Sequence, residues 1–160
     1  MKEKFPVTRA VHFLKQQGIV FEGHLYRYEG RSNVAQTAAA ALGIPEEQVY
    51  KTLVFQSEGK PLLILVDAAH TVAPGKLTAA LGAKRKVEPC EPRDAERFTG
   101  YQVGGISPFG TRTPLPVFID ECALRHEIIY VNGGSHGFMI ALNPNELVRV
   151  LKATTADITA

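Results

Sequence analysis

Apolar residues recur along the chain with two different spacings, which predict helices in some segments and strands in others. In the first segment, Val11 and Leu14 fall on one face of a helix. Thr8 is placed to cap the start of this helix, and Gly18 can adopt the left-handed conformation that ends it after Gln17. Four further helices are predicted: from a cap at Asn33 to Leu42, from Pro74 to Leu81, from Arg93 to Phe98, and from Asn143 or Asn145 to Leu151.

Strand patterns lie between these helices. Phe21 to Tyr28 is predicted as a strand in which His24 and Tyr26 share a face, because side chains alternate across a sheet. Two apolar runs separated by a turn sequence predict a hairpin that we expect to be central to the sheet. The remaining predicted strands are short. The hairpin strands are Tyr50 to Gln56 and Pro61 to Val66, and the others are Lys86 to Val87, Pro116 to Ile119, Glu127 to Val131 and Gly137 to Leu142.

The order of these elements indicates the fold class. Strands alternate irregularly with short helices, which favours an α/β (α+β) fold with a mixed, partly antiparallel sheet rather than a doubly wound nucleotide-binding fold. The chain has 160 residues and neither an internal repeat nor a linker, so a single domain over residues 1–160 is expected.

Composition excludes several classes of protein. The chain is 45% hydrophobic and 21% charged, which is typical of an ordered globular protein. A formal charge of +2 is too small for a protein that coats nucleic acid, although a local nucleic-acid contact stays open. The longest aliphatic run, Leu62 to Val66, is far shorter than a membrane span, and no apolar stretch follows Met1 to Lys4 as a secretory signal requires. A soluble cytoplasmic protein is therefore expected.

Neither metal nor disulfide chemistry is indicated. Cys90 and Cys122 are interpreted as free, reduced thiols, because no export signal accompanies them. The five histidines are scattered and no metal-binding spacing is present, so no metal or other cofactor is expected. Serine-hydrolase elbows and phosphate-binding glycine motifs are absent as well.

Lys51 is the first candidate for chemistry. It opens an otherwise apolar strand, and burying an unpaired ammonium group costs several kcal/mol. The side chain must therefore either extend into solvent at the end of the strand or face a polar cavity.

Two glycine-rich segments are the other candidates. In Gly104–Pro108, glycine amides can approach a ligand closely and form an oxyanion hole, although a simple tight turn explains the same residues. In 132–137, Asn-Gly-Gly suits a hairpin turn, and His136 is either a donor at a cleft or a surface histidine. The basic run Lys84-Arg85-Lys86 is either a phosphate contact or a solvated face.

Taken together, three segments resemble the bacterial YbaK/EbsC family, which includes Cys-tRNA(Pro) deacylases and is similar to the editing domain of prolyl-tRNA synthetases. The segments are 49–55 (VYKTLVF), 101–110 (YQVGGISPFG) and 129–134 (IYVNGG). The resemblance implies a largely antiparallel, barrel-like sheet with surrounding short helices. It also implies trans-editing hydrolysis of mischarged aminoacyl-tRNA, either Cys-tRNA(Pro) or another small amino acid on tRNA.

The resemblance also assigns roles to residues. Lys51 becomes the essential site lysine, and the loop of Gly104, Gly105, Ile106, Ser107 and Pro108 positions the acyl group and terminal ribose. Tyr26 and Thr52 line the pocket, and Gly133 and Gly134 form the opposite wall. Asn132 and His136 depart from the pattern of cysteinyl-specific members, which leaves alanine, serine and threonine open as alternative substrates. The implied partner is the aminoacyl-tRNA acceptor end, with prolyl-tRNA synthetase as a second candidate.

Two other hypotheses stay open at this point. A module that binds the tRNA acceptor end or prolyl-tRNA synthetase without chemistry would need the same loops. A hydrolase of small acyl esters unrelated to tRNA is the third. The oligomeric state is not indicated.

Overall fold

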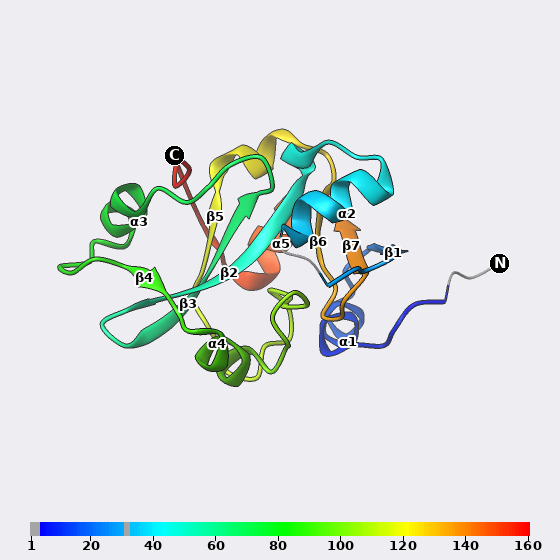
Figure 1. Ribbon diagram of the computed structural model, residues 1–160, viewed down its shortest axis with the longest axis horizontal. Coiled ribbons are helices and arrows are strands. Elements are labelled where there is room, and N and C mark those ends of the chain that lie inside the picture. Colours follow the sequence, from blue (N-terminus) through cyan, green and yellow to red (C-terminus); the bar gives the residue numbers. More distant parts are fainter. Residues whose placement is uncertain (1–3, 31–32) are drawn as a thin grey trace.

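The computed structural model describes residues 4–30 and 33–160, and these form one curved mixed sheet flanked by short helices (Figure 1). The helices of the described residues are α1 (Arg9–Gln16), α2 (Val34–Leu42), α3 (Pro74–Leu81), α4 (Pro92–Thr99) and α5 (Pro144–Leu151), with short 3₁₀ turns at Glu46–Gln48 and Glu121–Arg125. The strands are β1 (Glu22–Leu25), β2 (Val49–Ser57), β3 (Lys60–Asp67), β4 (Glu88–Pro89), β5 (Val117–Asp120), β6 (Ile129–Asn132), β7 (Phe138–Leu142) and β8 (Thr154–Ala156).

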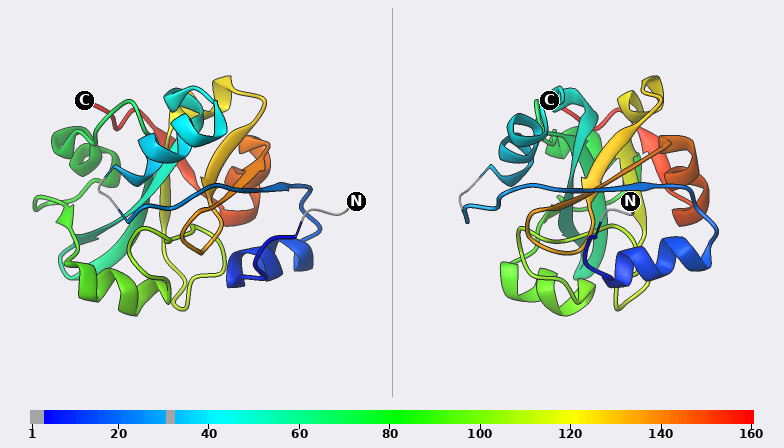
Figure 2. Two further views of the ribbon diagram at one scale, coloured as in Figure 1. Left: turned by 45° about the vertical axis from the view of Figure 1, so that its right-hand side comes forward. Right: turned by 90° about the vertical axis from the view of Figure 1, so that its right-hand side faces the viewer.

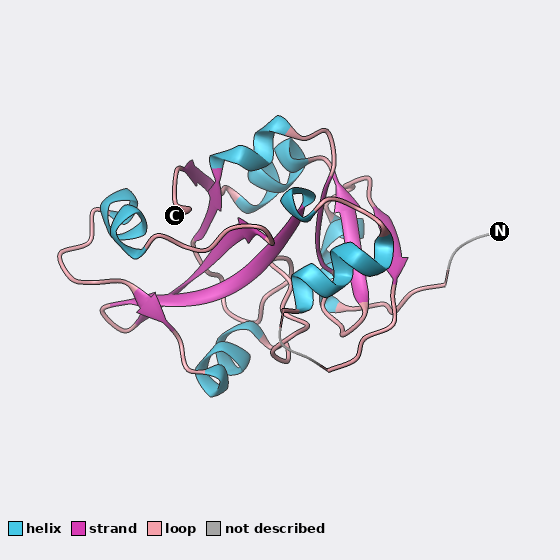
Figure 3. Ribbon diagram, turned by 45° about the horizontal axis from the view of Figure 1, so that its top comes forward, coloured by secondary structure: helices cyan, strands magenta, loops and turns pink. Residues whose placement is uncertain are grey.

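The β2–β3 hairpin lies at the centre of the sheet, as the sequence predicts (Figure 3). Its two-residue turn places Glu58 and Gly59 at positive φ, which matches the twist of the flanking strands. Side chains of β3 alternate between two apolar clusters, with Leu63 and Leu65 on one face and Ile64 on the other. The hairpin is therefore buried on both faces and forms a rigid base for whatever lies at its edges.

The sheet is mixed, in agreement with the predicted fold class. Its order is β1-β7-β6-β2-β3-β5-β8, and β4 pairs with β2 off this path. Four pairings are antiparallel, whereas β2–β6, β3–β5 and β5–β8 are parallel. β1 and β8 stand at the two ends of this order, so the described strands curve strongly without closing a ring (Figure 2).

One edge of β2 is only partly paired. β6 pairs with Val49 and Tyr50, and β4 pairs with Phe55 and Gln56. Between these two contacts, residues 51–54 have a strand partner on the β3 side alone. The sheet is therefore open along the outer edge of β2, at residues 51–54.

The helices begin and end largely where the sequence predicts. The Thr8 hydroxyl accepts a hydrogen bond from the Val11 amide at the start of α1, and the Asn143 side chain caps α5 in the same way. Pro74 occupies the first turn of α3. Gly43 and Gly82 end α2 and α3 in the left-handed conformation. No helix of the described residues is long and apolar enough to cross a membrane.

Three predicted details are wrong, and one strand was not predicted. Asn33 does not cap α2, because it adopts a left-handed conformation with φ 63° and its side chain makes no capping bond. The first strand ends at Leu25 rather than Tyr28, since its partner β7 begins only at Phe138. The short strand predicted at Lys86–Val87 lies at Glu88–Pro89. The strand β8 was not predicted, because Thr154 and Thr155 are exposed and carry no apolar alternation.

The tight approach of Gly133 to Phe138 gives a testable consequence for stability. A Cβ at position 133 would lie 2.4 Å from two ring carbons of Phe138, which is fully buried and stacks on Phe5. Gly133→Ala is expected to lower the free energy of unfolding by about 1–3 kcal/mol, the usual cost of overpacking a core. Chemical denaturation measures this change.

The matched control is Gly75→Ala in α3. Gly75 has open space around the position of a Cβ and an ordinary helical φ. Alanine there should leave stability unchanged or raise it by about 0.5–1 kcal/mol through helix propensity. Equal losses in the two variants would show that the Phe138 contact is not the cause.

Candidate active site

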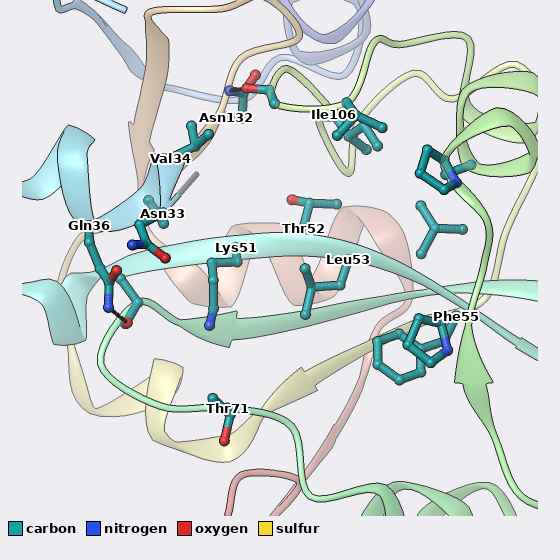
Figure 4. A pocket seen from close by; sticks show the side chains of 18 of the residues that line it. Asn33, Val34, Gln36, Lys51, Thr52, Leu53, Phe55, Thr71, Ile106 and Asn132 are labelled. Carbon is teal, nitrogen blue, oxygen red and sulfur yellow. Dashed lines mark hydrogen bonds between the residues drawn. The ribbon is translucent and has the colours of Figure 1, made fainter. Parts of the chain in front are cut away.

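A cavity of about 640 Å³ lies against the open edge of β2 (Figure 4). Its walls come from six parts of the chain: the start of α2, the β2 edge, the 68–71 loop after β3, the segment from β4 into α4, the loop that carries Gly104, and Asn132 at the end of β6. Lys51 and Thr52 form part of the floor. The sequence left two alternatives for Lys51, solvent at the strand end or a polar cavity, and the structure places it at the edge of a cavity.

Thr52 presents both backbone and side-chain polar groups at this edge. The carbonyl of Val54 accepts a bond from the Cys90 amide, so the peptide groups of Val54 point outward from the hairpin. Peptide groups of a strand alternate in direction, and those of Thr52 therefore point to the same edge. The Thr52 hydroxyl is buried and has no hydrogen-bond partner within the described residues. A buried polar group without a partner is rare and indicates a position where a ligand or water binds.

The Lys51 side chain projects from the face of β2 opposite to that of the Thr52 side chain, because neighbouring side chains on a strand alternate. Its Nζ donates a hydrogen bond of 2.7 Å to the carbonyl of His70 in the 68–71 loop. Burial lowers the pKa of Lys51 from its ordinary 10.5, and the nearby Asp67 carboxylate works in the other direction. An ammonium group carries three donors, so two remain for a ligand in the cavity.

His70 and Asp67 form a pair that the sequence analysis missed. Asp67 ends β3 and is buried, and its carboxylate accepts a bond of 2.7 Å from Nδ1 of His70. His70 lines the cavity, whereas its side chain is half exposed. This bond and the negative charge of Asp67 raise the pKa of His70 above its ordinary 6.5. The signal available in the sequence was an aspartate ending an apolar strand, with a histidine three residues later.

The loop 101–110 is anchored firmly at its base. The Tyr101 hydroxyl donates to the carbonyl of Phe109, which closes the loop. Burial raises the pKa of Tyr101 to about 12, so the hydroxyl keeps its proton at neutral pH. Phe109 is fully buried and stacks on Phe13 of α1. The base of the loop therefore belongs to the main core and cannot shift independently of it.

The tip of this loop forms a tight turn in which the two glycines differ. The Gly105 amide donates to the Gln102 carbonyl and is therefore already occupied. Gly104 lines the cavity at φ 89°, and within the described residues neither its amide nor that of Ile106 has a hydrogen-bond partner. Glycine is required at 104, because φ of this sign is strained for other residues. Gly104 therefore keeps an unpartnered amide on a residue that lines the cavity, whereas the Gly105 amide closes the turn.

Asn132 and His136 hold the loop tip against the β6–β7 hairpin. Asn132 Nδ2 donates to the Gly104 carbonyl at 3.2 Å, while its Oδ1 accepts from the amides of Gly134 and Ser135. His136 Nε2 donates to the Val103 carbonyl at 2.9 Å, and its ring stacks on Tyr28. Both residues therefore fix the position of Gly104. The hypothesis that they select the amino acid directly stays untested.

The predicted site residues fall into two groups. Those that line the cavity are Lys51, Thr52, Gly104, Ile106 and Asn132. Those that lie behind its walls are Tyr26, Gly105, Ser107, Pro108, Gly133, Gly134 and His136.

The residues behind the walls act as supports. Tyr26 packs under α2 among small apolar residues, and burial raises the pKa of its hydroxyl. Ser107 is fully buried and accepts a bond from the Phe109 amide. Gly133 fits under Phe138, and its carbonyl accepts a bond from the Thr8 hydroxyl. These residues position the loops and do not form the cavity surface.

The cavity has a polar end and an apolar end. Asn33, Gln36, Lys51 and Thr71 lie toward one end, and Leu53, Phe55 and Ile106 toward the other (Figure 4). The described part of its lining contains no aspartate or glutamate, and Lys51 and His70 are the titratable bases in that part. Such a cavity suits a ligand that has both an anionic or hydroxylated part and an apolar part.

Two further observations concern metals and thiols. Within residues 4–30 and 33–160, no three His, Cys, Asp or Glu side chains are grouped so that they could hold a metal ion. Cys90 and Cys122 are free thiols, as the sequence predicts. Cys90 lines the cavity, and burial, together with Asp94, raises the pKa of its thiol. Cys90 is therefore a poor nucleophile at neutral pH.

Comparison with known proteins identifies relatives along nearly the whole chain. The chain is 29% identical over 153 residues to EbsC of Enterococcus faecalis, provisionally named a Cys-tRNA(Pro)/Cys-tRNA(Cys) deacylase, with 95% of this chain and 93% of that protein covered. It is 33% identical to proline--tRNA ligase of Nitratidesulfovibrio vulgaris over 89 residues, which are 56% of this chain and 15% of the ligase.

A solved structure is also similar to this chain over nearly its whole length. The crystal structure described provisionally as a trans-editing enzyme for prolyl-tRNA synthetase superposes with a TM-score of 0.83 at 28% identity and covers 99% of both chains. Residues 31–150 match the model of the aminoacyl-tRNA editing domain. Because this match spans three quarters of the sequence, the chain belongs to the aminoacyl-tRNA editing domain family.

Proposed function

We propose that this protein hydrolyses the ester that joins a wrongly attached amino acid to the 3′ end of a tRNA. The observation that carries this proposal is one cavity lined by Lys51, by Thr52 with its unpaired hydroxyl, and by Gly104, whose amide has no partner within the described residues. Membership of the editing domain family and the likeness to EbsC support the same activity.

The chemistry needs no nucleophile from the protein. An aminoacyl ester is already activated, so positioning and stabilisation of the developing oxyanion supply much of the acceleration. The amides of Gly104 and Ile106 are the donors for the oxyanion, since both lack partners within the described residues and both residues line the cavity. Water attacks the carbonyl, and the bond to the ribose oxygen breaks to release the free amino acid and the tRNA. In a cysteinyl substrate the side-chain thiol attacks instead and expels the same ribose oxygen, which gives a cyclic thioester that water then opens to cysteine.

Lys51 acts as a positioning cation in this mechanism. Its Nζ lies at the polar end of the cavity and is bonded to the His70 carbonyl. Thr52, on the adjacent position of β2, offers its hydroxyl and peptide groups to the ribose or the substrate amine. Held in this way, the ester spans the cavity from the β2 edge to the Gly104 loop.

The substrate is a tRNA that carries a small amino acid. The names of EbsC and of the trans-editing enzyme support tRNA(Pro) bearing cysteine, and alanine, serine and threonine are the alternatives. Prolyl-tRNA synthetase is a candidate partner, because its own chain contains a segment similar to this one. A charged tRNA substrate favours the cytoplasm as the place of action, and the single domain over residues 1–160 stays a prediction from the sequence.

The test is a deacylation panel with tRNA(Pro) charged with cysteine, alanine, serine, threonine or proline. At least one mischarged tRNA should lose its amino acid well above the spontaneous rate, while Pro-tRNA(Pro) stays charged. Tight binding of mischarged tRNA without turnover would instead support a recognition module. Equal rates on a free aminoacyl ester and on the charged tRNA would support a general esterase.

A further inference from the structure

Within the proposed editing function, we infer that His70, held by Asp67, forms together with Lys51 a subsite for the phosphodiester that precedes the terminal ribose of the tRNA. Lys51 Nζ is hydrogen-bonded to the backbone carbonyl of His70, so the ammonium lies beside the residue that carries the imidazole. The inference rests on the proposed function for the identity of the ligand, and on geometry for the site itself.

The orientation of His70 leaves one ring nitrogen for a ligand. Nδ1 donates to Asp67 Oδ2 at 2.7 Å, and the side chain of Asp67 is only 4% exposed. Asp67 pairs with Tyr50 in the β2–β3 register, so the carboxylate is fixed to the central hairpin. Nε2 has no partner within the described residues, and the half-exposed ring lies on the cavity wall. A fixed imidazole with one free N–H is suited to donate to an anion.

Charge at this end of the cavity favours an anion. Asp67 is the main cause of the raised pKa of His70, and Asp120 and Glu47 act in the same direction. The ammonium of Lys51 is the neighbouring positive group. Among the described residues that line the cavity there is no carboxylate, and Lys51 and His70 are the members of that lining that can carry positive charge.

The surrounding backbone adds to the same preference. Asn33, Val34, Ala35 and Gln36 at the start of α2 line the cavity, and the helix has no side-chain cap. Gln36 Nε2 donates to the Ala68 carbonyl at 3.2 Å, which holds the 68–71 loop against α2. Uncapped amides at a helix start favour negative charge. This contribution reinforces the two cations and keeps their loop in place.

The position of His70 separates phosphate binding from base catalysis. Thr71, its neighbour, lies beyond Lys51 on one side of β2, whereas Asn132 and Ile106 lie on the other side with the Gly104 loop (Figure 4). If the carbonyl is held at Gly104, the part of the substrate that reaches His70 is the ribose-phosphate end. His70 is therefore a positioning residue for the tRNA and not the base that activates water.

The kinetic test compares two substrates that share the ester but differ in phosphate. His70→Ala should raise KM for the mischarged tRNA about tenfold, the effect of losing one charge-assisted hydrogen bond, with kcat nearly unchanged. The same variant should not change hydrolysis of the corresponding aminoacyl-adenosine, which has no phosphate. A fall in kcat on both substrates would overturn the inference in favour of a general base.

A conservative variant and pH add a second readout. In the wild type, KM for tRNA should rise as pH increases through the raised pKa of His70, because the imidazolium loses its proton. His70→Lys should restore the low KM and remove this pH dependence. His12→Ala is the control, since His12 is an exposed histidine on α1 and does not line the cavity. A KM that is independent of pH in the wild type would contradict the inference.

A binding experiment does not depend on activity. The pKa of His70, followed by NMR, should rise further when the dinucleotide CpA is added and should not change with adenosine. If the wild type deacylates no tRNA but CpA still shifts His70, the subsite stands and the proposed function fails. If CpA leaves His70 unchanged while the wild type is active, the subsite is wrong and the proposed function stands.

Discussion

Lys51→Ala is expected to lower kcat/KM for deacylation of mischarged tRNA by at least about a hundredfold while the protein stays folded. The substitution removes the ammonium that lies on the cavity floor and contacts the 68–71 loop through the His70 carbonyl. Loss of one preorganised polar donor from an active site typically costs a factor of about 10² to 10³. Steady-state deacylation kinetics measure the effect.

The control for this variant is Lys60→Ala. Lys60 begins β3 at the far end of the same hairpin and is exposed, so its removal changes the net charge equally without touching the cavity. Deacylation by Lys60→Ala should stay within about twofold of the wild type, since surface substitutions are usually near neutral. Similar losses in both variants would indicate a general effect of charge on tRNA binding.

Lys51 favours activity, but its charged form is expected to lower the stability of the folded protein. Its pKa is lowered in the folded protein, so the unfolded chain binds the proton more strongly. Wild-type stability should therefore rise as pH increases from the lowered pKa toward 10.5, and this rise should be absent in Lys51→Ala. Thermal unfolding across this pH range measures it. A variant that unfolds at lower temperature at neutral pH would show that Lys51 is needed for folding and would weaken its assignment to the site.

Asn132→Asp is expected to lower kcat/KM by about tenfold to a hundredfold with little loss of stability. The aspartate keeps an oxygen that accepts from the Gly134 and Ser135 amides, so the hairpin turn survives. It replaces the Nδ2 donor with an oxygen 3.2 Å from the Gly104 carbonyl oxygen. Two facing acceptors repel each other, and the loop tip must move away from the position that presents the Gly104 amide.

Asn132→Ala and Asn145→Asp complete this comparison. The alanine variant also loses the acceptor, which leaves the amides of Gly134 and Ser135 without a partner and should cost about 1–3 kcal/mol of unfolding free energy. Asn145 is exposed on α5, so its aspartate variant should retain wild-type kinetics. Full activity in Asn132→Asp would show that the tie between Asn132 and Gly104 does not position the site.

Much of the fold followed from local signals in the sequence. Thr8, Pro74, Gly82 and Asn143 were predicted at helix ends because capping depends on a few neighbouring residues, and the structure confirms each of them. The central hairpin was equally clear, since its apolar strands flank a turn that needs positive φ. Where pairing depends on distant partners, as for β8 and the end of β1, the sequence carried no pattern to predict it.

Some parts of the candidate site could likewise be predicted from local sequence, and others could not. Lys51 and the glycine loop could be selected from sequence because a charged residue in an apolar strand and a run of glycines are unusual locally. The open edge of β2 could not be predicted from the sequence, because it results from the pairing of β6 and β4 with β2 on either side of residues 51–54. The His70–Asp67 pair was missed for a related reason, since burial of Asp67 appears only when β3 is packed on both faces.

The central claim is that a mischarged ester is cleaved in the cavity between the β2 edge and the Gly104 loop. The most direct measurement is single-turnover release of the amino acid from Cys-, Ala-, Ser- and Thr-charged tRNA(Pro), with wild type and Lys51→Ala each in excess over tRNA. We predict rapid release from at least one of these tRNAs by the wild type and release near the spontaneous rate by Lys51→Ala. Spontaneous rates for the wild type on all four tRNAs, or equal release by both proteins, would contradict the claim.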